Sequence, residues 1–583
     1  MSENIDLPAG RQEKLRHSLA HVLAQVILEL YPKTKIGMGP AIENGFYYDF
    51  QFAKPITEQD LQKIENKMKE FLAQDLKFVK KNITKLAAKK LFKDQLYKLE
   101  LIKDLPGKTV SIYESGKFVD LCKGPHIKNT KEINQNAFKL TKIAGAYWKG
   151  DEKNKMLTRI YGIAFETENE LANYLKMIEE AEKRDHRKLG KELDLFCFSE
   201  LVGPGLPLYT ARGVIVKEEL QKEVEKICRS YGFEKVSAPS LAKIELYEIS
   251  GHAKKFNEEL FRVSSPSGHK LVLKPVQCPH HTQIYASKPR SYKDLPIRYM
   301  ESDKQYRAEK PGEVGGLTRV YAITVEDGHT FCTREQVKDE IKNLVNIIKD
   351  FYTSMGLWGN HWVSLSTRGK DFSKYIGEKK DWDLCEKILQ EVSDEMGLSA
   401  KKCPGEAALY GPKLDFMFKD AIGKEIQIPT VQIDFATPKK FDLVFTDKDG
   451  KEKSPVMVHR AILGSYERFM ALIIEHFAGA FPVWLSPVQA TILPIGESHF
   501  EYTKKIKEEL KKNNIRVEVI EEGTLGKKIR EAELQKIPYL LIVGDKEIST
   551  NTVSVRARGK GDEGQMPLEK FIEKITNEIK SKK

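Results

Sequence analysis

Two histidines in one expected helix are the first residues whose spacing suggests chemistry. Residues 16–27 read RHSLAHVLAQVI, where apolar residues recur at helical spacing and His17 and His21 stand four positions apart. Side chains at that spacing project from one face of a helix. Two such imidazoles supply half of a zinc site, but the glutamate that a metalloprotease helix carries between them is absent.

A second pair of potential ligands lies in the segment DLCKGPH, where Cys122 and His126 stand four positions apart across a Gly-Pro turn. Three imidazoles and a thiol form a chemically reasonable zinc donor set. Two histidines in a helix are also compatible with an ordinary buried core. The residues alone therefore leave a metal site and a structural role open.

The elements that position these residues are expected to be of mixed type. In the first part of the chain, strands are expected at 45–52 and 117–122, and a helix at 57–74. A long charged helix is expected at 166–196, and its basic continuation predicts the first domain boundary after residue 183.

The middle of the chain has an expected helix at 213–232, then strand-rich sequence punctuated by Gly and Pro, and an apolar helix at 464–480. That order is an α+β pattern around an antiparallel sheet. The rest of the chain predicts a small α/β domain with alternating elements: a strand at 490–496, a helix, a strand at 515–520, a helix at 525–537, strands at 539–544 and 552–558, and a final helix.

Composition narrows the class of protein. The 583 residues carry 96 basic and 84 acidic side chains, a net charge of +12 that weakly favours a polyanionic partner such as nucleic acid. Seven scattered cysteines without a CxxC pair indicate a reducing compartment, and the cytoplasm fits. The N-terminus lacks the apolar core of a signal peptide, and the best apolar run, 471–485, is too short to span a membrane and carries Glu475 and His476.

Two segments of the middle region carry a resemblance to a known family. Residues 297–329 read as two strands joined by a Gly- and Pro-rich loop, with Arg307 and Glu309 at the end of the first strand. Residues 459–477 open an apolar helix with Gly464, Glu467 and Arg468. These segments resemble motifs 2 and 3 of the class II aminoacyl-tRNA synthetases, and the helix that leads into an expected strand, FEKVSAPS, resembles motif 1.

The match runs over nearly the whole chain and is greatest to the threonyl-tRNA synthetase family. It implies ATP-dependent ligation of L-threonine to tRNA through a threonyl-adenylate, with editing of mischarged seryl-tRNA. It also implies a multidomain α+β fold: an editing domain at 1–183, a class II antiparallel-sheet catalytic domain at 184–485 and an α/β anticodon-binding domain at 486–583. The form expected is one without the small N-terminal domain that many relatives carry.

The resemblance implies roles for charged residues of the catalytic domain. Arg307 is expected to contact the α-phosphate and the reacting carboxylate, Glu309 the adenine amino group, and Arg468 the γ-phosphate. Lys413 and Gln432 match positions that contact the reacting phosphate and the ribose. Guanidinium groups suit this task because they bind oxyanions in a defined, bidentate geometry. Magnesium is expected to accompany ATP.

Cys278, His329 and His459 match the three zinc ligands of the family, although nothing in their spacing would have grouped them. His280 and His281 beside Cys278 are treated as bystanders. An open zinc position accepts the amino and hydroxyl groups of threonine, with Asp327 expected to receive the hydroxyl proton, and excludes valine. Serine lacks only a methyl group, worth about 1–3 kcal/mol, so a second site that removes serine is expected.

The histidines of the first domain supply that second site by resemblance. HxxxH followed by CxxxH resembles the editing domain of threonyl- and alanyl-tRNA synthetases, and in the threonyl family this pocket works without a metal. Neutral imidazoles near physiological pH suit hydrogen-bonding of water and ester. The implied editing residues are His17, His21, Lys98, Asp120, Cys122 and His126.

The last domain also matches the family, whereas two residues of the catalytic domain differ from the family pattern. Glu547 and Arg556 match positions that read anticodon bases, where a carboxylate and a guanidinium can bond exposed base edges. Motif 1 implies a homodimer. Ile323 and Val325 stand where relatives commonly have Phe and Gln, so an aromatic contact to adenine and an amide contact to the amino acid are lost. A related class II synthetase with another amino-acid choice, or a non-ligating RNA-binding paralogue, stays the alternative.

Overall fold

The computed structural model describes residues 10–310, 312–419, 423 and 425–582. These residues form two compact units, Met1–Glu179 and Glu180–Lys583, of which the first includes nine undescribed residues at its start. In the described part of the chain, no helix has the length and apolarity needed to cross a bilayer.

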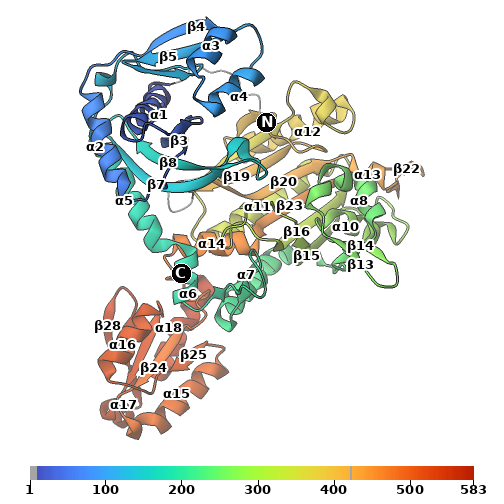
Figure 1. The fold of residues 1–583 in the computed structure, drawn as a ribbon. Coiled ribbons are helices and arrows are strands. Elements are labelled where there is room, and N and C mark those ends of the chain that lie inside the picture. Colours follow the sequence, from blue (N-terminus) through green and yellow to red (C-terminus); the bar gives the residue numbers. More distant parts are fainter. Residues whose placement is uncertain (1–9, 311, 420–422, 424, 583) are drawn as a thin grey trace. The chain divides into compact units, whose positions relative to one another are not determined.

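The first unit is built on helix α1 (Arg11–Leu30), which packs against one face of an antiparallel sheet in the order β1-β3-β8-β7, with β2 paired to β3 (Figure 1). Leu19, Leu23 and Ile27 of α1 are fully buried, as expected for apolar residues on one helical face. The strands are β1 (Lys35–Ile36), β2 (Ala41–Ile42), β3 (Gly45–Gln51), β7 (Phe138–Tyr147) and β8 (Met156–Ala164).

A smaller antiparallel sheet in the same unit has the order β4-β5-β6 and carries Asp120 at its end, just before Cys122. Its strands are β4 (Val79–Thr84), β5 (Thr109–Ser115) and β6 (Phe118–Leu121). The remaining helices are α2 (Asp60–Leu72), α3 (Lys85–Leu91), α4 (Leu96–Asp104) and the short turns η1 (Thr130–Glu132) and η2 (Trp148–Gly150).

The second unit has a central sheet of eight strands in the order β11-β15-β16-β23-β20-β19-β17-β18. Only its two outer pairs, β11 with β15 and β17 with β18, are parallel, so the expected antiparallel sheet is confirmed. The strands are β11 (Glu234–Lys235), β15 (Ile297–Tyr306), β16 (Ala322–Cys332), β17 (His361–Thr367), β18 (Lys401–Pro404), β19 (Lys413–Lys419), β20 (Glu425–Asp434) and β23 (Val456–Ser465).

Helices cover one face of this sheet with a large apolar core, whereas the other face carries the polar residues considered below. Ile341, Leu344 and Ile348 of one long helix are fully buried against the strands. The helices of this region are α6 (His186–Glu192), α7 (Ala211–Ser230), α8 (Ile244–Ser250), α9 (His252–Lys255), α10 (Cys278–Ala286), α11 (Val337–Ser354), α12 (Lys379–Glu395), α13 (Thr437–Lys440), α14 (Tyr466–His476), η3 (Asn257–Glu259) and η4 (Phe372–Lys374). Short paired strands lie beside them: β9 (Phe196–Cys197) with β10 (Leu208–Tyr209), β12 (Leu241–Ala242) and β13 (Arg262–Ser264) with β14 (Lys270–Leu273), and β21 (Phe445–Thr446) with β22 (Glu452–Lys453).

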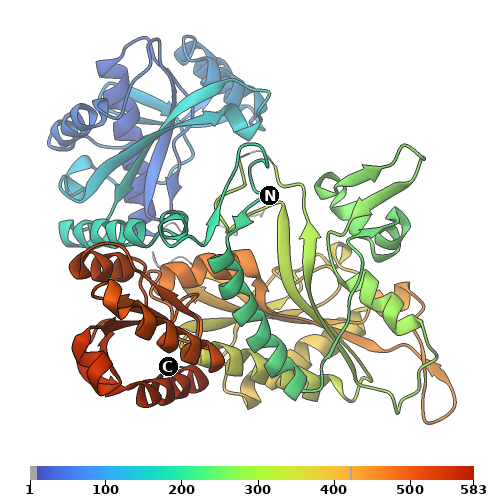
Figure 2. The same cartoon turned by 90° about the horizontal axis from the view of Figure 1, so that it is seen from below.

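The C-terminal part of this unit is a five-stranded mixed sheet with helices on both faces (Figure 2). Helices α15 and α18 pack on one face, and α16 packs on the other. The elements are β24 (Ala490–Pro494), η5 (Glu497–His499), α15 (Phe500–Lys512), β25 (Val517–Val519), α16 (Leu525–Leu534), β26 (Tyr539–Val543), α17 (Asp545–Thr550), β27 (Thr552–Ala557), β28 (Gly561–Pro567) and α18 (Leu568–Ser581).

Two expectations about elements were wrong in detail, and two further elements were missed. The helix expected at 166–196 is two helices, α5 (Glu168–Arg184) and α6, because the Asp185 side chain accepts a hydrogen bond from Arg187 N–H and starts a new helix. The expected strand in FEKVSAPS shrinks to Glu234–Lys235. Helix α17 and strand β28 were missed, since both are short and rich in polar residues.

Candidate functional sites

Cross-strand register aligns four predicted site residues in one row of the central sheet. Lys413 pairs with Gln432, Gln432 pairs with His459, and His459 pairs with His329. Residues directly opposite each other in a sheet project to the same face. These side chains, which are far apart in sequence, therefore lie together on the face that the large apolar core leaves free.

Cys278, His329 and His459 converge at one end of this row. Cys278 is the first residue of α10, and the three ligand atoms lie within 4.8 Å of one another. His329 Nε2 is fully buried and has no hydrogen-bond partner among the described residues. A buried lone pair without a partner is costly in a structural site but suits a metal ligand. One thiolate and two imidazoles leave open positions of the kind that a catalytic zinc site needs.

His281, which the sequence analysis treated as a bystander, contacts one of these ligands. Its Nε2 lies 3.2 Å from Glu301 Oε2, and its Nδ1 lies 2.8 Å from His329 Nδ1. Because Nε2–H donates to the carboxylate, Nδ1 of a neutral His281 accepts from His329 Nδ1–H. His329 then presents the lone pair of Nε2 toward the cluster, which is the usual arrangement around a metal-bound histidine. His459 Nε2 is similarly placed 2.9 Å from Asp434 Oδ2.

Asp327 lies two residues before His329 on the same face of β16, with its Oδ1 3.8 Å from His329 Nε2. Burial raises the pKa of this carboxyl group from its usual value. Ile323 and Val325 continue the same alternation along β16 and are only half-buried, so both departures from the family pattern face the site. The structure therefore places the Asp327 carboxyl group beside the Cys278, His329 and His459 cluster.

The arginines of the two motifs lie next to each other where β15 and β16 meet α14. Arg468 Nε faces Thr318 O at 3.4 Å, and its backbone N–H is capped by Ser465 Oγ. Desolvation, and then the neighbouring charges of Arg307 and Arg319, lower the pKa of Arg468. Guanidinium groups placed this close together are suited to bind a polyphosphate.

Glu309 is paired with Arg319, a residue that the sequence analysis did not single out. Arg319 Nη2 lies 2.7 Å from Glu309 Oε2 and 2.9 Å from Glu313 Oε2. The position of Arg319 inside the motif 2 loop is the sequence signal that could have identified it. At the far end of the row, Lys413 Nζ lies 2.7 Å from Asp415 Oδ2, and Gln432 Nε2 donates to Gly411 O at 3.3 Å.

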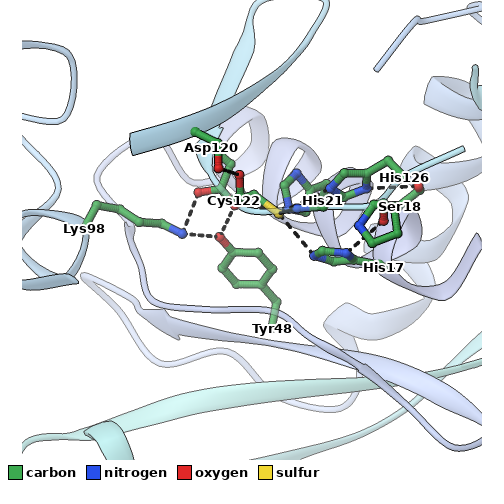
Figure 3. A network of polar contacts seen from close by, with 11 residues as sticks. His17, Ser18, His21, Tyr48, Lys98, Asp120, Cys122 and His126 are labelled. Carbon is green, nitrogen blue, oxygen red and sulfur yellow. Dashed lines mark hydrogen bonds and ion pairs between the residues drawn. The ribbon is translucent and has the colours of Figure 1, made fainter. Parts of the chain in front are cut away.

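The first unit brings together the second predicted cluster (Figure 3). The ligand atoms of His17, His21, Cys122 and His126 lie within 4.8 Å of one another. Cys122 Sγ lies 3.3 Å from His17 Nε2 and 3.4 Å from His126 Nε2. Helix α1 supplies two of these residues, and the segment after β6 supplies the others, so tertiary packing joins the two motifs.

Hydrogen bonds on the far side of the rings set the tautomers of this cluster. His17 Nδ1 lies 3.1 Å from Pro125 O, to which it must donate. Ser18 Oγ donates to Lys14 O, so it accepts from His126 Nδ1–H. Both rings therefore direct Nε2 lone pairs at Cys122, whose single S–H proton can satisfy only one of them. One lone pair is left to accept a hydrogen bond from water or to bind an ion.

Burial keeps this cluster uncharged. It lowers the pKa of His17, His21 and His126 below the usual value of 6.5 and raises the pKa of the Cys122 thiol to about 12. The histidines are therefore neutral acceptors at neutral pH, and the cysteine is a thiol rather than a thiolate.

An ion pair lies behind the cluster. Lys98 Nζ lies 2.5 Å from Asp120 Oδ1, and both residues are almost completely buried. Tyr48, which the sequence analysis missed, donates its hydroxyl to Asp120 Oδ2 at 2.6 Å, and His21 Nε2 lies 3.5 Å from the same oxygen. The carboxylate thus orients His21, and Figure 3 shows Lys98, Tyr48 and Asp120 as one connected network.

The two residues expected to read anticodon bases differ in their surroundings. Glu547 is buried, and its carboxylate accepts hydrogen bonds from Gly544 N–H, Ser554 Oγ and Gln565 Nε2. Arg556 lies two residues after Ser554 on the same face of β27, is half-exposed and approaches Glu533 to 3.9 Å. Arg556 is therefore the more accessible of the two.

Comparisons with known proteins agree with this arrangement. Residues 261–477 match the tRNA synthetase class II core domain (G, H, P, S and T), residues 489–578 match an anticodon binding domain, and residues 110–161 match the threonyl and alanyl tRNA synthetase second additional domain. A threonine-tRNA ligase from Rubrobacter xylanophilus is 45% identical to this chain over 98% of the chain and 89% of its own length. The chain belongs to the threonyl-tRNA synthetase family.

Further members and structures are consistent with this assignment. The threonine-tRNA ligase of Gloeobacter violaceus is 45% identical over 98% of this chain and 93% of its own length. The solved RNA binding domain of threonyl-tRNA synthetase from Cryptosporidium parvum Iowa II has a TM-score of 0.64 and 34% identity, covering 67% of this chain and 98% of its own. The family, the fold class and the threonine-tRNA ligase activity predicted from the motifs are confirmed.

Proposed function

We propose that this member of the threonyl-tRNA synthetase family joins L-threonine to its tRNA in two steps. The threonine carboxylate attacks the α-phosphate of ATP, forming threonyl-adenylate as the bond to pyrophosphate breaks. A ribose hydroxyl at the 3′ end of the tRNA then attacks the carbonyl carbon and releases AMP. Magnesium accompanies ATP in this scheme.

The proposed roles in the first step follow from charge and position. Arg307 and Arg468 lie beside one another and neutralise the charge that spreads over the phosphates as the bond breaks. Glu309 reads the adenine amino group, and Lys413 and Gln432 face the reacting phosphate and the ribose from the same sheet. Because these groups are in place before substrate binds, little reorganisation accompanies the reaction.

Cys278, His329 and His459 are proposed to hold one zinc ion, which when bound supplies a Lewis acid for the amino and hydroxyl groups of threonine. The unpartnered Nε2 of His329 and the mutual approach of the three ligand atoms support this role. Asp327 is proposed to take the hydroxyl proton. Metal analysis of the purified protein should find one zinc per chain, and the Cys278→Ala variant should lose it.

The single observation that carries the proposal is the convergence of this cluster with Asp327, Lys413 and Gln432 on one sheet face. Pyrophosphate exchange into ATP tests it, with threonine, serine and valine supplied separately. We expect exchange with threonine, weaker exchange with serine and none with valine. Exchange driven by another amino acid would instead indicate an altered substrate, and exchange without any amino acid would favour a non-ligating paralogue.

The cluster in the first unit is proposed to hydrolyse seryl-tRNA without a metal. The free Nε2 lone pair facing Cys122 accepts a hydrogen bond from the attacking water, while Lys98, Asp120 and His21 orient the cluster. Release of serine from seryl-tRNA should continue after zinc is removed with a chelator, whereas threonine-dependent exchange should stop. A parallel loss of both activities would contradict a metal-free site.

The proposed organisation is an editing domain at 1–183, a catalytic domain at 184–485 and an anticodon-binding domain at 486–583, in which Glu547 and Arg556 read bases of the tRNA. The match of residues 489–578 to an anticodon binding domain supports tRNA as the partner. Free cysteines in the described chain support a reducing compartment such as the cytoplasm.

A homodimer is proposed because motif 1 implies one and because several apolar side chains between residues 198 and 214, just before and within α7, are solvent-exposed. They are Phe198, Leu201, Val202, Leu208 and Val214. Exposed apolar patches of this kind mark protein interfaces. Leu201→Glu should convert the dimer to a monomer in light scattering, while Leu86→Glu, at an exposed leucine of the first unit, should leave the dimer intact.

A further inference from the structure

His186, at the start of α6, has both ring nitrogens engaged by distant parts of the chain. Nδ1 lies 2.7 Å from Glu475 Oε1 in α14, and Nε2 accepts a hydrogen bond from Leu317 N–H at 3.1 Å. Because Nε2 accepts, the proton of the neutral ring resides on Nδ1 and is donated to Glu475. Asp185, His186 and Glu475 are close enough to hold a metal ion, but His186 has no lone pair left for one.

The contact positions a tight turn in the motif 2 loop. Gly315 N–H donates to Arg319 O, and Thr318 N–H donates back to Gly315 O. At Gly316 φ is +50°, and an added Cβ would lie 2.2 Å from His186 Nε2. Only glycine therefore lets the backbone come this close to the imidazole.

This turn contacts two of the groups proposed to bind ATP, Glu309 and Arg468. Thr318 O faces Arg468 Nε, and Arg319 is paired with Glu309. In the described part of the chain, the hydrogen bonds of the turn stay within the loop apart from those to His186 and Arg468. The Leu317 side chain is fully buried, so the hydrogen bond anchors the backbone where the side chain enters the core.

We propose that His186 is a positioning residue for adenylate formation. By accepting from Leu317 N–H while donating to Glu475, it holds the motif 2 turn against α14 and so keeps Glu309, Arg319 and Arg468 in the geometry that receives ATP. The inference rests on the proposed roles of Glu309 and Arg468, but it concerns a residue that touches neither substrate nor the reacting atoms.

Variants of His186 in the full chain test this role. The amide of Gln reaches about as far as Nε2, so His186→Gln keeps an acceptor for Leu317, whereas His186→Asn keeps only a group near Glu475. We expect His186→Asn to lower kcat/KM for ATP in threonine-dependent exchange by about tenfold or more. His186→Gln should remain within about threefold of the native enzyme.

Two further readouts separate positioning from loss of folding. Amide hydrogen exchange in peptides covering residues 315–319 should speed up in His186→Asn and not in His186→Gln. Seryl-tRNA deacylation, which uses the first unit, should be unchanged in both variants. If the native enzyme itself shows no exchange activity, the proposed function fails, and the hydrogen-exchange comparison still reports on the contact.

A matched pair of loop variants gives an independent test. Gly316→Ala places a Cβ against His186, whereas Gly312→Ala, also at positive φ, meets nothing within 4 Å. We expect only Gly316→Ala to reproduce the loss in kcat/KM for ATP. Equal losses of kcat/KM in the two glycine variants would overturn the proposal. Equal kcat/KM values for His186→Gln and His186→Asn would also overturn it. If His186→Asn is too unstable to assay, the comparison of Gly316→Ala with Gly312→Ala decides.

Discussion

His281 Nδ1 lies 2.8 Å from His329 Nδ1, so a residue outside the proposed ligand set determines which nitrogen of His329 faces the other ligands. Glu301 determines the tautomer of His281 in turn. Glu301, His281 and His329 are therefore linked by consecutive hydrogen bonds. This chain ends at Nε2 of His329, whose lone pair has no partner among the described residues.

Removal of His281 should weaken metal binding without removing a ligand. We expect His281→Ala to lower zinc affinity by about 10- to 100-fold, because His329 is then free to take the wrong tautomer or orientation. Competition with a chromophoric chelator measures the affinity directly. His280→Ala is the matched control, since the ring nitrogens of His280 have no partner among the described residues. Equal affinities in the two variants would contradict the proposed chain of hydrogen bonds.

Arg468 should matter for catalysis far more than for folding. We expect Arg468→Met to reduce threonine-dependent pyrophosphate exchange by about a hundredfold or more, because a fixed guanidinium group facing the phosphates is lost. The side chain is exposed and forms no ion pair in the described structure, so stability should change by about 0.5 kcal/mol or less. Exchange kinetics and chemical denaturation measure the two effects. A variant with native exchange rates would remove Arg468 from the site.

Replacement of Val325 by Gln should place a polar amide on the same face of β16 as Asp327. We expect Val325→Gln to lower KM for threonine by about two- to tenfold, which corresponds to one added hydrogen bond. Val325→Leu adds similar bulk without an amide and should not lower KM. If both variants behave alike in steady-state exchange, the amide has no partner on the substrate.

The buried histidines of the first unit should make its stability depend on pH. Their pKa values are lowered in the folded state, so the unfolded chain takes up protons as pH falls through the usual value of 6.5, while the folded chain does not. The stability that these neutral histidines contribute above pH 6.5 is therefore lost progressively as the pH falls below that value. Calorimetry between pH 8 and 5 should show a smaller decline in His126→Gln, and identical declines would contradict neutral burial.

The Lys98–Asp120 pair should show strong coupling. Lys98→Met leaves the Asp120 carboxylate buried with Tyr48 as its remaining close donor and should cost about 3–5 kcal/mol of stability. Adding Asp120→Asn removes the stranded charge and should recover much of that loss. Denaturant unfolding of the native protein, both single variants and the double variant gives the coupling energy. Additive losses would mean that the two groups act independently.

The sequence by itself determined which elements form and which residues can do chemistry. Apolar residues at helical spacing predicted α1, and two strand-like runs around a Gly- and Pro-rich loop predicted β15 and β16. The motif arginines predicted a nucleotide site, and the two Cys/His motifs predicted a single cluster. Short polar elements such as α17 were not predicted because their stability comes from tertiary contacts rather than from a local sequence pattern.

Only the tertiary structure decided which distant groups share a hydrogen bond. Register places His329 opposite His459, α10 brings His281 to His329, and α6 brings His186 to Leu317. A tautomer depends on the partner of the opposite ring nitrogen, and no spacing rule encodes a partner that only tertiary packing brings into contact. The residues that can act as ligands can therefore be identified from the sequence, whereas the direction in which their lone pairs point depends on tertiary packing.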